Sequence, residues 1–501
     1  MLSGTKEILL LTFILPVVIL FIYALQLRLS KNKRRNAVFR RLGITNVDGK
    51  SLVGFFHPYC NAGGGGELVL WTAVAFLQRT EPNLVSVVYT GDTDATKDAI
   101  IGKVKARFNI DLSPDSLHFV FLKSRRLVED STWPVFTLLG QSLGSMILAW
   151  EAMHKLIPHI YIDTMGYAFT LPVVRMLGNI PRGAYVHYPT ISTIMLERVK
   201  SRQAGYTNSG VISSSPIFSK GKLLYYRIFM YYYCQSLKEA SFIMVNSSWT
   251  QAHVDAILKH TDTLLDSLHC LIPFKLPGSV GQTSSIETQI VYPPCETREM
   301  AQFPLKNRER VILSVAQFRP EKNHQAQLFA FYELLVQHPE YRSGPSAVKL
   351  VLVGGCRNAG DFSRVKGLRA CVKDLKMEEN VEFVVNAPYH EVLAWLARAS
   401  IGLSTMVDEH FGVNIVEFMA AGVIPVTHAS GGPLNDIVVP FEGRPTGYHA
   451  TETLAFVEAM QTVLAMLKDE EIAMRSRARR WAVQRFSREE FEKGWEKSGW
   501  K

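Results

Sequence analysis

The chain has 501 residues, of which 47% are apolar and 20% charged, and its formal net charge is +10 at pH 7. This length exceeds one typical hydrophobic core, so we expect two globular domains with attachments, and the composition excludes wholesale disorder. The positive charge suits nucleic acid, anionic lipid or a phosphorylated ligand. Because no zinc-finger spacing or aromatic RNA-binding motif accompanies it, we expect lipid or phosphate rather than nucleic acid.

The N-terminal segment predicts a retained membrane anchor. Residues from Ile8 to Leu27 form a stretch of about 20 positions without a charge, which at 1.5 Å per residue matches the ~30 Å hydrocarbon core of a bilayer. A cleaved signal peptide, the alternative, has a shorter apolar region followed by small residues, whereas a basic cluster from Arg28 to Arg41 follows here. By the positive-inside rule this cluster places the body of the protein in the cytosol. Six scattered cysteines without a C-x-x-C pair agree with reduced thiols there.

The body of the chain alternates short β-rich runs with helical patterns. This alternation predicts an α/β fold, in which parallel sheets have helices on both faces. We assign residues 1–30 to the anchor, 51–290 and 291–486 to two doubly wound domains, and 487–501 to a closing helix. The expected strands are Ser51–Phe56, Leu84–Tyr89, Leu117–Leu122, His159–Ile162, Gly183–His187, Ser241–Val245, Arg310–Val315, Lys349–Val353, Val381–Val385, Ile401–Ser404 and Val423–Thr427.

Two further segments have an unusual composition for a water-soluble domain. Trp133 to Trp150 is apolar and uncharged, and Leu223 to Tyr233 is rich in tyrosine. Each is compatible with an ordinary buried helix. Each is also compatible with a helix at the membrane interface, where tyrosine is enriched.

The strongest chemical pattern is a pair of glutamates, Glu409 and Glu417, around the start of a helix near Gly412. The N–H groups and dipole at a helix start favour an anion such as a nucleotide diphosphate. Glu417 lies one to two turns inside the helix, where a carboxylate can bind ribose hydroxyls, and Glu409 lies ahead of it, where it can reach the attached sugar. The alternative is two solvated carboxylates on a surface helix. A functional site is the better interpretation because Gly422 ends the helix and Ser430-Gly431-Gly432-Pro433 follows the next strand, a combination that is far less common than two glutamates at this spacing.

This pattern, in the second of two doubly wound domains, resembles the retaining glycosyltransferases of family 4. Their GT-B fold has two Rossmann-like domains that face a cleft. Five strings in combination are more closely similar to the GDP-mannose-dependent α-1,2-mannosyltransferases of asparagine-linked glycosylation. These strings are FFHPYCNAGGGGE (55–67), YVHYPTIST (185–193), AQFRPEKNH (316–324), GGCRN (354–358) and EHFG with ASGGPLNDIV (409–438).

The resemblance implies an enzyme that adds the fourth and fifth mannoses to dolichol-pyrophosphate-linked Man3GlcNAc2, with retention, at the cytosolic face of the endoplasmic reticulum. It implies GDP-mannose as donor, a single-pass protein of the endoplasmic reticulum membrane, and other mannosyltransferases of the pathway as partners. We expect no nucleic-acid partner. Two alternatives stay open: a family 4 enzyme with another nucleotide sugar or lipid acceptor, and a non-catalytic subunit of a glycosylation complex.

Arg319 and Lys322 follow an expected strand, where two cations suit a pyrophosphate. The family has its arginine where Gln317 stands, so the resemblance supports Lys322 directly and Arg319 as a substitute. The alternative is a solvated surface pair. The expected catalytic residues are Glu409, Glu417, Arg319 and Lys322. The expected donor-binding residues are Gly64, Gly65, Arg319, Lys322, Glu409, His410, Phe411, Gly412, Val413 and Glu417.

The acceptor is expected at the first domain. A run of four glycines permits close backbone approach and opens a helix, although a flexible turn is the simpler alternative. Two histidines and an aspartate end expected strands, at the edge where such sheets bind ligands, although a lone histidine is more often structural. The expected acceptor-binding residues are His57, Gly63, Gly66, Asp163 and His187.

We expect no metal ion and no cofactor besides the donor substrate. Asp92-Thr93-Asp94 looks like the D-x-D metal site of other glycosyltransferases, but it lies in the first domain, whereas the donor is expected in the second. Two positions depart from the family pattern. Ile194 stands where an aspartate is usual, and Asn414 stands where small residues are common.

Overall fold

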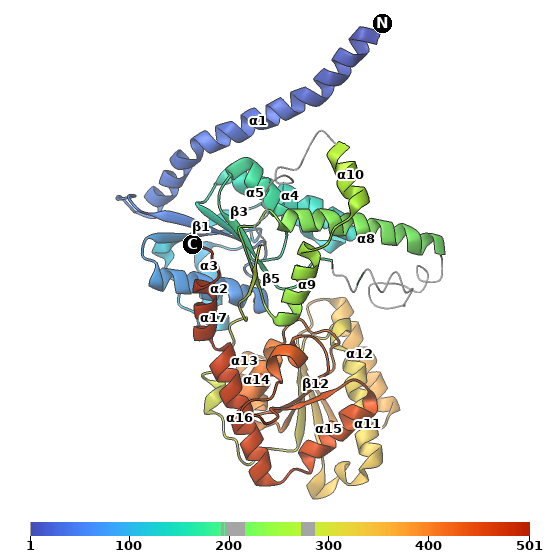
Figure 1. Cartoon of the computed structure of the whole chain (residues 1–501). Coiled ribbons are helices and arrows are strands. Elements are labelled where there is room, and N and C mark those ends of the chain that lie inside the picture. Colours follow the sequence, from blue (N-terminus) through green and yellow to red (C-terminus); the bar gives the residue numbers. More distant parts are fainter. Residues whose placement is uncertain (1, 192–194, 196–215, 272–285) are drawn as a thin grey trace. The chain divides into compact units, whose positions relative to one another are not determined.

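The computed structural model describes residues 2–191, 195, 216–271 and 286–501. The chain divides into two compact units, each built around one sheet (Figure 1). Unit 1 comprises Met1–Val245, Gln251–Gln289 and Trp495–Lys501, and unit 2 comprises Asn246–Thr250 and Ile290–Gly494. The main change of unit falls between Gln289 and Ile290, one residue before the boundary that the sequence analysis assigns.

Unit 1 contains a seven-stranded sheet in the order β3-β2-β1-β4-β5-β6-β7, and its pairings from β3 to β6 are parallel. The strands are β1 (Ser51–Phe56), β2 (Leu84–Thr90), β3 (Leu117–Phe121), β4 (Ile160–Asp163), β5 (Arg182–Val186), β6 (Phe242–Val245) and β7 (Thr288–Ile290). The helices are α1 (Leu2–Arg41), α2 (Gly65–Thr80), α3 (Lys97–Phe108), α4 (Thr137–Lys155), α5 (Thr170–Gly178), α8 (Pro216–Leu237), α9 (Ser248–Leu258) and α10 (Thr263–Leu271). Short 3₁₀ turns are η1 (Pro114–Ser116), η2 (Ser124–Val128) and η3 (Asp130–Thr132).

Unit 2 contains a six-stranded parallel sheet in the order β10-β9-β8-β11-β12-β13. The strands are β8 (Val311–Val315), β9 (Lys349–Gly354), β10 (Val381–Val385), β11 (Ile401–Ser404), β12 (Ile424–His428) and β13 (Tyr448–Ala450). The helices are α11 (His324–Gln337), α12 (Ala359–Asp374), α13 (Tyr389–Arg398), α14 (Val413–Ala421), α15 (Thr453–Leu464), α16 (Lys468–Phe486) and α17 (Arg488–Glu496). Single turns are η4 (Met300–Gln302), η5 (Pro320–Lys322), η6 (Pro339–Tyr341), η7 (Gly344–Ser346) and η8 (Pro433–Ile437).

The predicted α/β class and all eleven predicted strands are confirmed. The strands form because short runs rich in aliphatic and aromatic residues are largely buried on both faces of a parallel sheet. Two edge strands, β7 and β13, were not predicted, and each is only three residues long. The expected closing helix corresponds to α17, whose Trp495 belongs to unit 1 and stacks on Tyr185 with a centroid distance of 6.4 Å.

Strand order reverses once in each sheet. β1 lies between β2 and β4, and β8 lies between β9 and β11. The connections that leave two such neighbouring strands run to opposite sides, which leaves a crevice at their carboxyl ends. The topology therefore marks the ends of β1 and β4 in unit 1, and of β8 and β11 in unit 2, as ligand sites.

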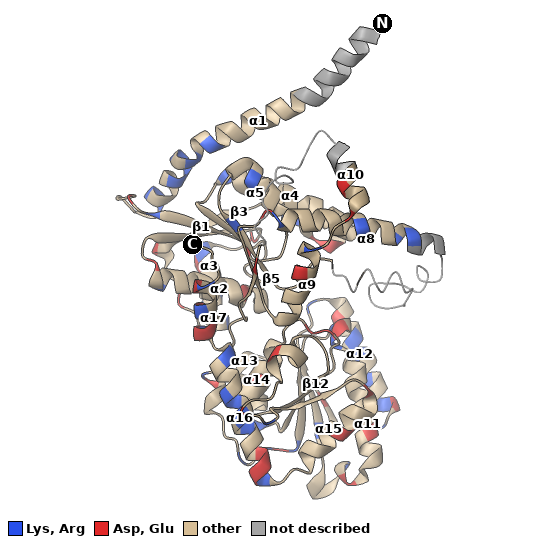
Figure 2. Cartoon of the chain, in the orientation of Figure 1, with Lys and Arg blue, Asp and Glu red and all other residues tan. Residues whose placement is uncertain are grey.

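The N-terminal helix α1 has two parts. Within the described residues, Leu15–Arg41 is the one helical segment long and apolar enough to cross a membrane. Most of its large apolar side chains are exposed as far as Leu29, which is 76% exposed, whereas Ala24 and Leu27 are buried. The basic part, where Lys and Arg gather in Figure 2, is attached to unit 1. There Arg35 donates from Nε to the carbonyl oxygen of Ile157 at 2.9 Å and from Nη2 to that of Pro158 at 2.5 Å.

Helices α4 and α8 each have one buried and one exposed face, so each packs on unit 1 as a partly buried helix, and the membrane interpretation of the exposed face stays a prediction. Leu148 and Met153 of α4 and Tyr233 of α8 are buried in unit 1. The opposite face of each helix exposes large apolar side chains. On α4 and the turn before it these are Val135, Phe136, Leu139, Leu143 and Ile147, and on α8 they are Leu224 and Ile228.

We predict that Arg35→Ala destabilises the full-length chain by about 2–4 kcal/mol, because two buried carbonyl groups lose their donors. Lys33→Ala, two residues away and exposed, is the control and should change stability by less than about 0.5 kcal/mol. Denaturant unfolding in detergent measures both. Equal stability of the two variants would show that α1 is not attached through Arg35.

Candidate donor and acceptor sites

The loops after β8 and β11 meet at the carboxyl edge of the unit 2 sheet. The loop after β8 carries Lys322, and the loop after β11 carries Glu409, and the Lys322 ammonium forms an ion pair with the Glu409 carboxylate. Thr405, at the end of β11, donates its hydroxyl to the carbonyl oxygens of Lys322 at 3.2 Å and Asn323 at 3.0 Å. The structure thus brings together two of the predicted catalytic residues, which are 87 positions apart in the chain.

The glycines after β12 fix the backbone of the Glu409 loop. Gly431 has φ +63°, and a Cβ atom there would lie 2.2 Å from the carbonyl oxygen of Glu409. The N–H of Gly432 donates to that same oxygen at 2.8 Å. On the other side of the loop, Ser430 accepts a hydrogen bond from the N–H of Asp408 at 2.7 Å. Only glycine allows this close approach, so Glu409 is held in one position relative to Lys322.

Helix α14 begins at the same edge. Its N-cap is Gly412, with φ +113°, a conformation that favours glycine. Asn414 donates from Nδ2 to the carbonyl oxygen of Val315 at 3.1 Å, so the first turn of α14 is bound to the end of β8. This contact explains the departure from small residues at that position. Glu417 is half-buried in the second turn of α14, and Val413 opens the helix.

Arg319 lacks a full set of partners. Its Nε is buried without a hydrogen bond in the described part of the chain, and its Nη1 lies 3.7 Å from Glu321. Burial, followed by the nearby charge of Arg357, lowers the pKa of Arg319. A guanidinium that is partly buried beside another cation favours an added anion.

His410 and Phe411 contribute chiefly through packing. The His410 ring stacks on Trp249 with a centroid distance of 5.4 Å, and its carbonyl oxygen accepts from the Ser247 hydroxyl at 2.6 Å. Phe411 is buried against Tyr292, with a centroid distance of 5.8 Å. Both residues therefore hold the loop that carries Glu409.

In unit 1, a chain of polar contacts joins the ends of β1 and β4 to the glycine loop. His57 is fully buried, and its Nδ1 lies 2.8 Å from the Thr164 hydroxyl. Its Nε2 lies 3.3 Å from Oε1 of Glu67, and Oε2 of Glu67 accepts the N–H of Gly64 at 2.5 Å. Since both ring nitrogens are engaged within the protein, His57 orients the loop rather than presenting a free group.

His187 and the glycine loop complete this cluster. His187 is half-buried at the end of β5, and its Nε2 lies 3.1 Å from the carbonyl oxygen of Thr164. A Cβ atom at Gly66 would lie 3.6 Å from that nitrogen. Gly63 has φ +87°, and no other heavy atom would approach a Cβ atom at Gly65 within 4 Å. Of the predicted acceptor residues, Gly63, Gly66 and His187 are the accessible ones.

Asp163 is fully buried behind this cluster. Its Oδ1 accepts the N–H of Met165 at 2.8 Å, and its Oδ2 has no hydrogen-bond partner among the described residues. Burial raises the pKa of Asp163 to about 7, although backbone N–H groups of residues 165–167 oppose the rise. The carboxyl group thus holds the turn after β4 from inside.

Two residues of this cluster were missed from the sequence, Glu67 and Thr164. Glu67 is the third residue of α2, a position where an acidic side chain caps the helix start, and that signal was available. Thr164 gives no such signal, since its role follows from the pairing of β1 with β4. Ile194, the other position that departs from the family pattern, lies outside the described residues.

Both carboxylate oxygens of Asp92, in the D-x-D string, are already bound by other residues of the chain. Its Oδ2 accepts from the N–H of Asn61 at 2.9 Å and from the Thr90 hydroxyl at 3.0 Å. Its Oδ1 pairs with Nη1 of Arg125 at 2.5 Å. These contacts give Asp92 a structural role.

Two family models and several named proteins match this chain over most of its length. Residues 50–258 match the family model described as ALG11 mannosyltransferase N-terminus, and residues 296–481 match the model described as glycosyl transferases group 1. A human protein named GDP-Man:Man(3)GlcNAc(2)-PP-Dol alpha-1,2-mannosyltransferase is 45% identical, over 90% of this chain and 88% of its own length. The proteins of that name from Neurospora crassa and Kluyveromyces lactis are 44% and 35% identical, over 90% and 95% of this chain and 80% and 82% of their own lengths.

Solved structures share the fold. Anabaena Alr3699/HepE in complex with UDP and glucose has a TM-score of 0.55 and 16% identity, over 88% of this chain and 97% of its own. The apo structure of OtsA has a TM-score of 0.59 and 12% identity, over 89% of this chain and 98% of its own. The predicted GT-B fold is thereby confirmed.

We predict that Asp163→Asn flattens the pH dependence of stability. Because the pKa of Asp163 is raised on folding, its contribution to stability is fully present below about pH 4 and is lost as the pH rises through about 7. The wild-type unfolding free energy should fall over this range more steeply than that of the variant, and denaturant unfolding at several pH values measures the difference. Parallel curves for the two proteins would contradict the prediction.

Proposed function

The chain belongs to the family of GDP-Man:Man(3)GlcNAc(2)-PP-Dol α-1,2-mannosyltransferases, and we propose that it transfers mannose from GDP-mannose to lipid-linked Man3GlcNAc2. The observation that carries the proposal is the cluster of Arg319, Lys322 and Glu409 at the strand-order reversal of unit 2, beside the start of α14. The reaction adds the fourth and fifth mannoses, each to a 2-hydroxyl group.

Each residue of the cluster has a distinct task in this proposal. Arg319 and Lys322 bind the diphosphate of the donor, and the N–H groups at the start of α14 add to the positive potential. Glu409 positions the mannose, and Glu417 binds the ribose. Because these charges are fixed by the protein before the reaction, they stabilise the departing GDP without reorganisation.

Retention of configuration follows a front-face path in this proposal. The mannose–phosphate bond breaks first, and the acceptor oxygen attacks from the same face. The departing phosphate oxygen takes the acceptor's proton, so no protein nucleophile is required. Glu409 is paired with Lys322, which supports a positioning role for this carboxylate rather than a covalent one.

We propose that transfer needs no metal ion. Arg319, Lys322 and the helix start supply the positive charge that a divalent ion supplies elsewhere. The Asp92 carboxylate is engaged by Asn61, Thr90 and Arg125, which supports this reading of the D-x-D string.

The acceptor site is proposed at the glycine loop of unit 1. Gly63, Gly66 and the half-buried His187 offer backbone and ring groups to sugar hydroxyls. His57, Glu67 and Asp163 are positioning residues, since their polar atoms are buried and directed at the loops. A non-catalytic role is disfavoured because all four expected catalytic residues are present.

We predict that the purified full-length chain adds two mannoses to lipid-linked Man3GlcNAc2 from GDP-mannose in the presence of a chelator. Arg319→Ala, Lys322→Ala and Glu417→Ala should each lower kcat/KM roughly a hundredfold or more, because charges that stabilise or orient the donor are lost. Lys366→Ala, an exposed cation of α12, should leave it unchanged. Sensitivity of the product to α-1,2-mannosidase checks the linkage.

Two outcomes would contradict this function. If the chain is inactive with GDP-mannose but uses another nucleotide sugar, it is a different family 4 enzyme. If Arg319→Ala and Lys322→Ala transfer at the wild-type rate, the donor diphosphate is not bound at this cluster.

The homologues and the apolar α1 indicate a membrane-associated enzyme of the endoplasmic reticulum. We propose further that the two units of the chain face the cytosol. We also propose that the exposed apolar side chains of α4 lie in the bilayer interface. Leu139, Leu143 and Ile147 are spaced by four and form one stripe. Tyr225 of α8 extends it, since its hydroxyl accepts the N–H of Leu139 at 3.0 Å. At the other end Trp150 stacks on Tyr23 of α1 at 5.1 Å, so the stripe continues from the anchor.

We predict that Leu143→Glu with Ile147→Glu lowers transfer several-fold in vesicles, because two charges must enter the interface, and leaves transfer in detergent unchanged. Leu454→Glu, on an exposed apolar position of α15, is the control and should have no effect in either medium. An equal loss in detergent and in vesicles would show that the stripe acts on folding or catalysis instead of on membrane contact.

A further inference from the structure

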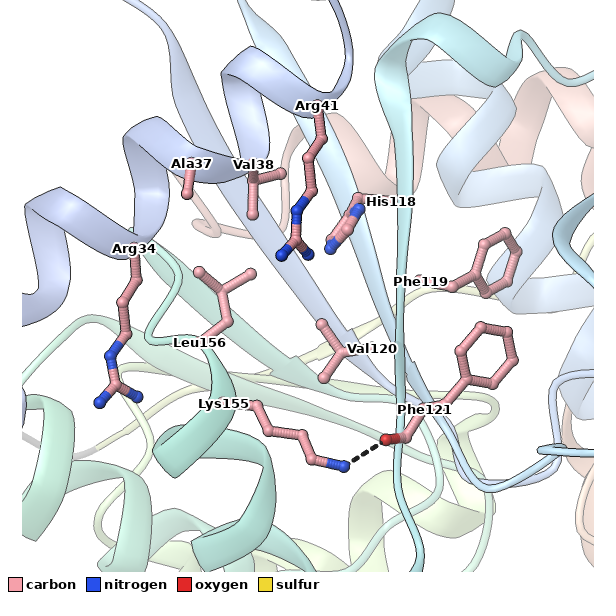
Figure 3. A pocket seen from close by; sticks show the side chains of 10 residues that line it. All are labelled: Arg34, Ala37, Val38, Arg41, His118, Phe119, Val120, Phe121, Lys155 and Leu156. Atoms are coloured by element: carbon pink, nitrogen blue, oxygen red, sulfur yellow. Dashed lines mark hydrogen bonds between the residues drawn. The ribbon is translucent and has the colours of Figure 1, made fainter.

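A hollow of about 370 Å³ lies in unit 1 between α1, the edge strand β3 and the end of α4 (Figure 3). The sheet order leaves β3 with one neighbour, and here its His118 and Val120 line the hollow. Apolar side chains of Val38 and Leu156 also contribute to the wall. This hollow is separate from the residues assigned to sugar transfer.

The hollow is lined by cations and by no acidic residue. Arg34 and Arg41 of α1 and Lys155 of α4 are among its ten lining residues. Lys155 is already paired, with Oε1 of Glu151 at 2.7 Å and the carbonyl oxygen of Phe121 at 2.5 Å. In the described part of the chain, Arg34 and Arg41 form no ion pair or hydrogen bond of their own. Two guanidinium groups therefore remain available to a ligand.

Helix α1 also carries two arginines, Arg28 and Arg35, that are already bound to carbonyl oxygens of unit 1. Arg28 donates to the carbonyl oxygen of Met176 at 2.6 Å, and Arg35 donates to those of Ile157 and Pro158. Residues seven positions apart lie on one face of a helix, so Arg28 and Arg35 form one row and Arg34 and Arg41 another. The first row attaches α1 to unit 1. In Figure 3 the second row points from α1 toward the hollow.

The potential in the hollow is positive. Burial is the largest cause that lowers the pKa of His118 to about 4, and the charges of Arg41 and Lys97 lower it further. The ring is thus neutral at physiological pH and has a hydrogen-bond donor to offer. An anion would meet guanidinium groups, a neutral N–H donor and no competing carboxylate.

The hollow also lies close to the membrane boundary. Leu29 is the last strongly exposed apolar residue of α1, and Arg34 follows five residues later, about 7.5 Å along the helix axis. The headgroup layer adds roughly 5–8 Å beyond the hydrocarbon core. Arg34 therefore reaches the depth of lipid phosphates, and Arg41 lies further along the same row.

We propose that this hollow is a binding site for a phosphate-bearing headgroup of an anionic phospholipid. Arg34 and Arg41 bind the phosphate oxygens, the His118 ring donates to the headgroup, and Val38 and Val120 contact the apolar acyl part of the lipid next to it. The site adds a specific lipid contact to the general attraction of a basic segment for an anionic membrane.

The test measures which lipids remain on the full-length protein, without donor or acceptor. The chain is purified in detergent with phosphatidylcholine alone or mixed with phosphatidylinositol, and retained lipid is quantified by native mass spectrometry. We expect preferential retention of phosphatidylinositol. Arg34→Gln with Arg41→Gln should weaken retention roughly tenfold, because two charge-assisted contacts to phosphate are lost.

The matched control is Lys33→Gln with Arg40→Gln. These residues have the same spacing and the same change in charge, but they do not line the hollow. We expect the control pair to retain phosphatidylinositol within about twofold of wild type. An equal loss in both pairs would show diffuse attraction to the basic helix and would overturn the site, as would the absence of any preference for phosphatidylinositol.

A second arm separates lipid from free phosphate. Inorganic phosphate is added at increasing concentration, and lipid retention and thermal stability are followed. We expect little displacement, because free phosphate lacks the apolar contacts. If phosphate alone stabilises the chain as much as the lipid does, the site binds a soluble anion and the lipid assignment is wrong. Mannosyl transfer in detergent should be unaffected by Arg34→Gln with Arg41→Gln, so failure of this site and failure of the proposed reaction are distinguishable.

Discussion

Parallel pairing gives each sheet a single direction, and that direction decides where the polar side chains of both sites lie. The parallel strands, β1–β6 in unit 1 and β8–β13 in unit 2, present their carboxyl ends at one edge of their sheet, and the reversal of strand order opens that edge at one place. In unit 2 this brings the loop of Lys322 beside the loop of Glu409. In unit 1 it brings His57 beside Thr164. Neither pair is close in sequence, so each depends on the sheet rather than on local structure.

At the carboxyl edge of the unit 2 sheet, glycines restrict the backbone and an ion pair fixes a side chain. Gly431 and Gly432 let the backbone approach Glu409 so closely that its loop has little freedom, and the Lys322 ion pair then fixes the carboxylate. Arg319 is compensated less completely, since its Nε has no partner in the described residues. The site therefore holds one cation that is closely paired and one whose only ion pair among the described residues, with Glu321, is long, and this is why the proposed function assigns the donor diphosphate to this place.

Sequence patterns predicted the parts of this structure that local chemistry decides. The apolar runs identified the strands, and Glu409, Arg319 and Lys322 were predicted as site residues because they follow strands or precede a helix. The sequence patterns did not show how deeply each side chain is buried. His57 and Asp163 were expected at the acceptor, but burial turns them inward, and their neighbours Glu67 and Thr164 become visible only once β1 pairs with β4. The edge strands β7 and β13 are too short for an alternating pattern to mark them.

The attachment of α1 links the membrane to the sheet of unit 1. A basic flank that was free in solution would place this domain at no fixed height above the bilayer. Arg28 instead binds backbone carbonyl groups in the last turn of α5, Arg35 binds those just after α4, and Tyr23 stacks on Trp150. These contacts make the flank part of the domain, so the orientation of the anchor is passed to α4 and its exposed stripe. For an acceptor that is itself embedded in the membrane, a domain held at a constant height reduces the search for the transferring hydroxyl to motion within the membrane plane.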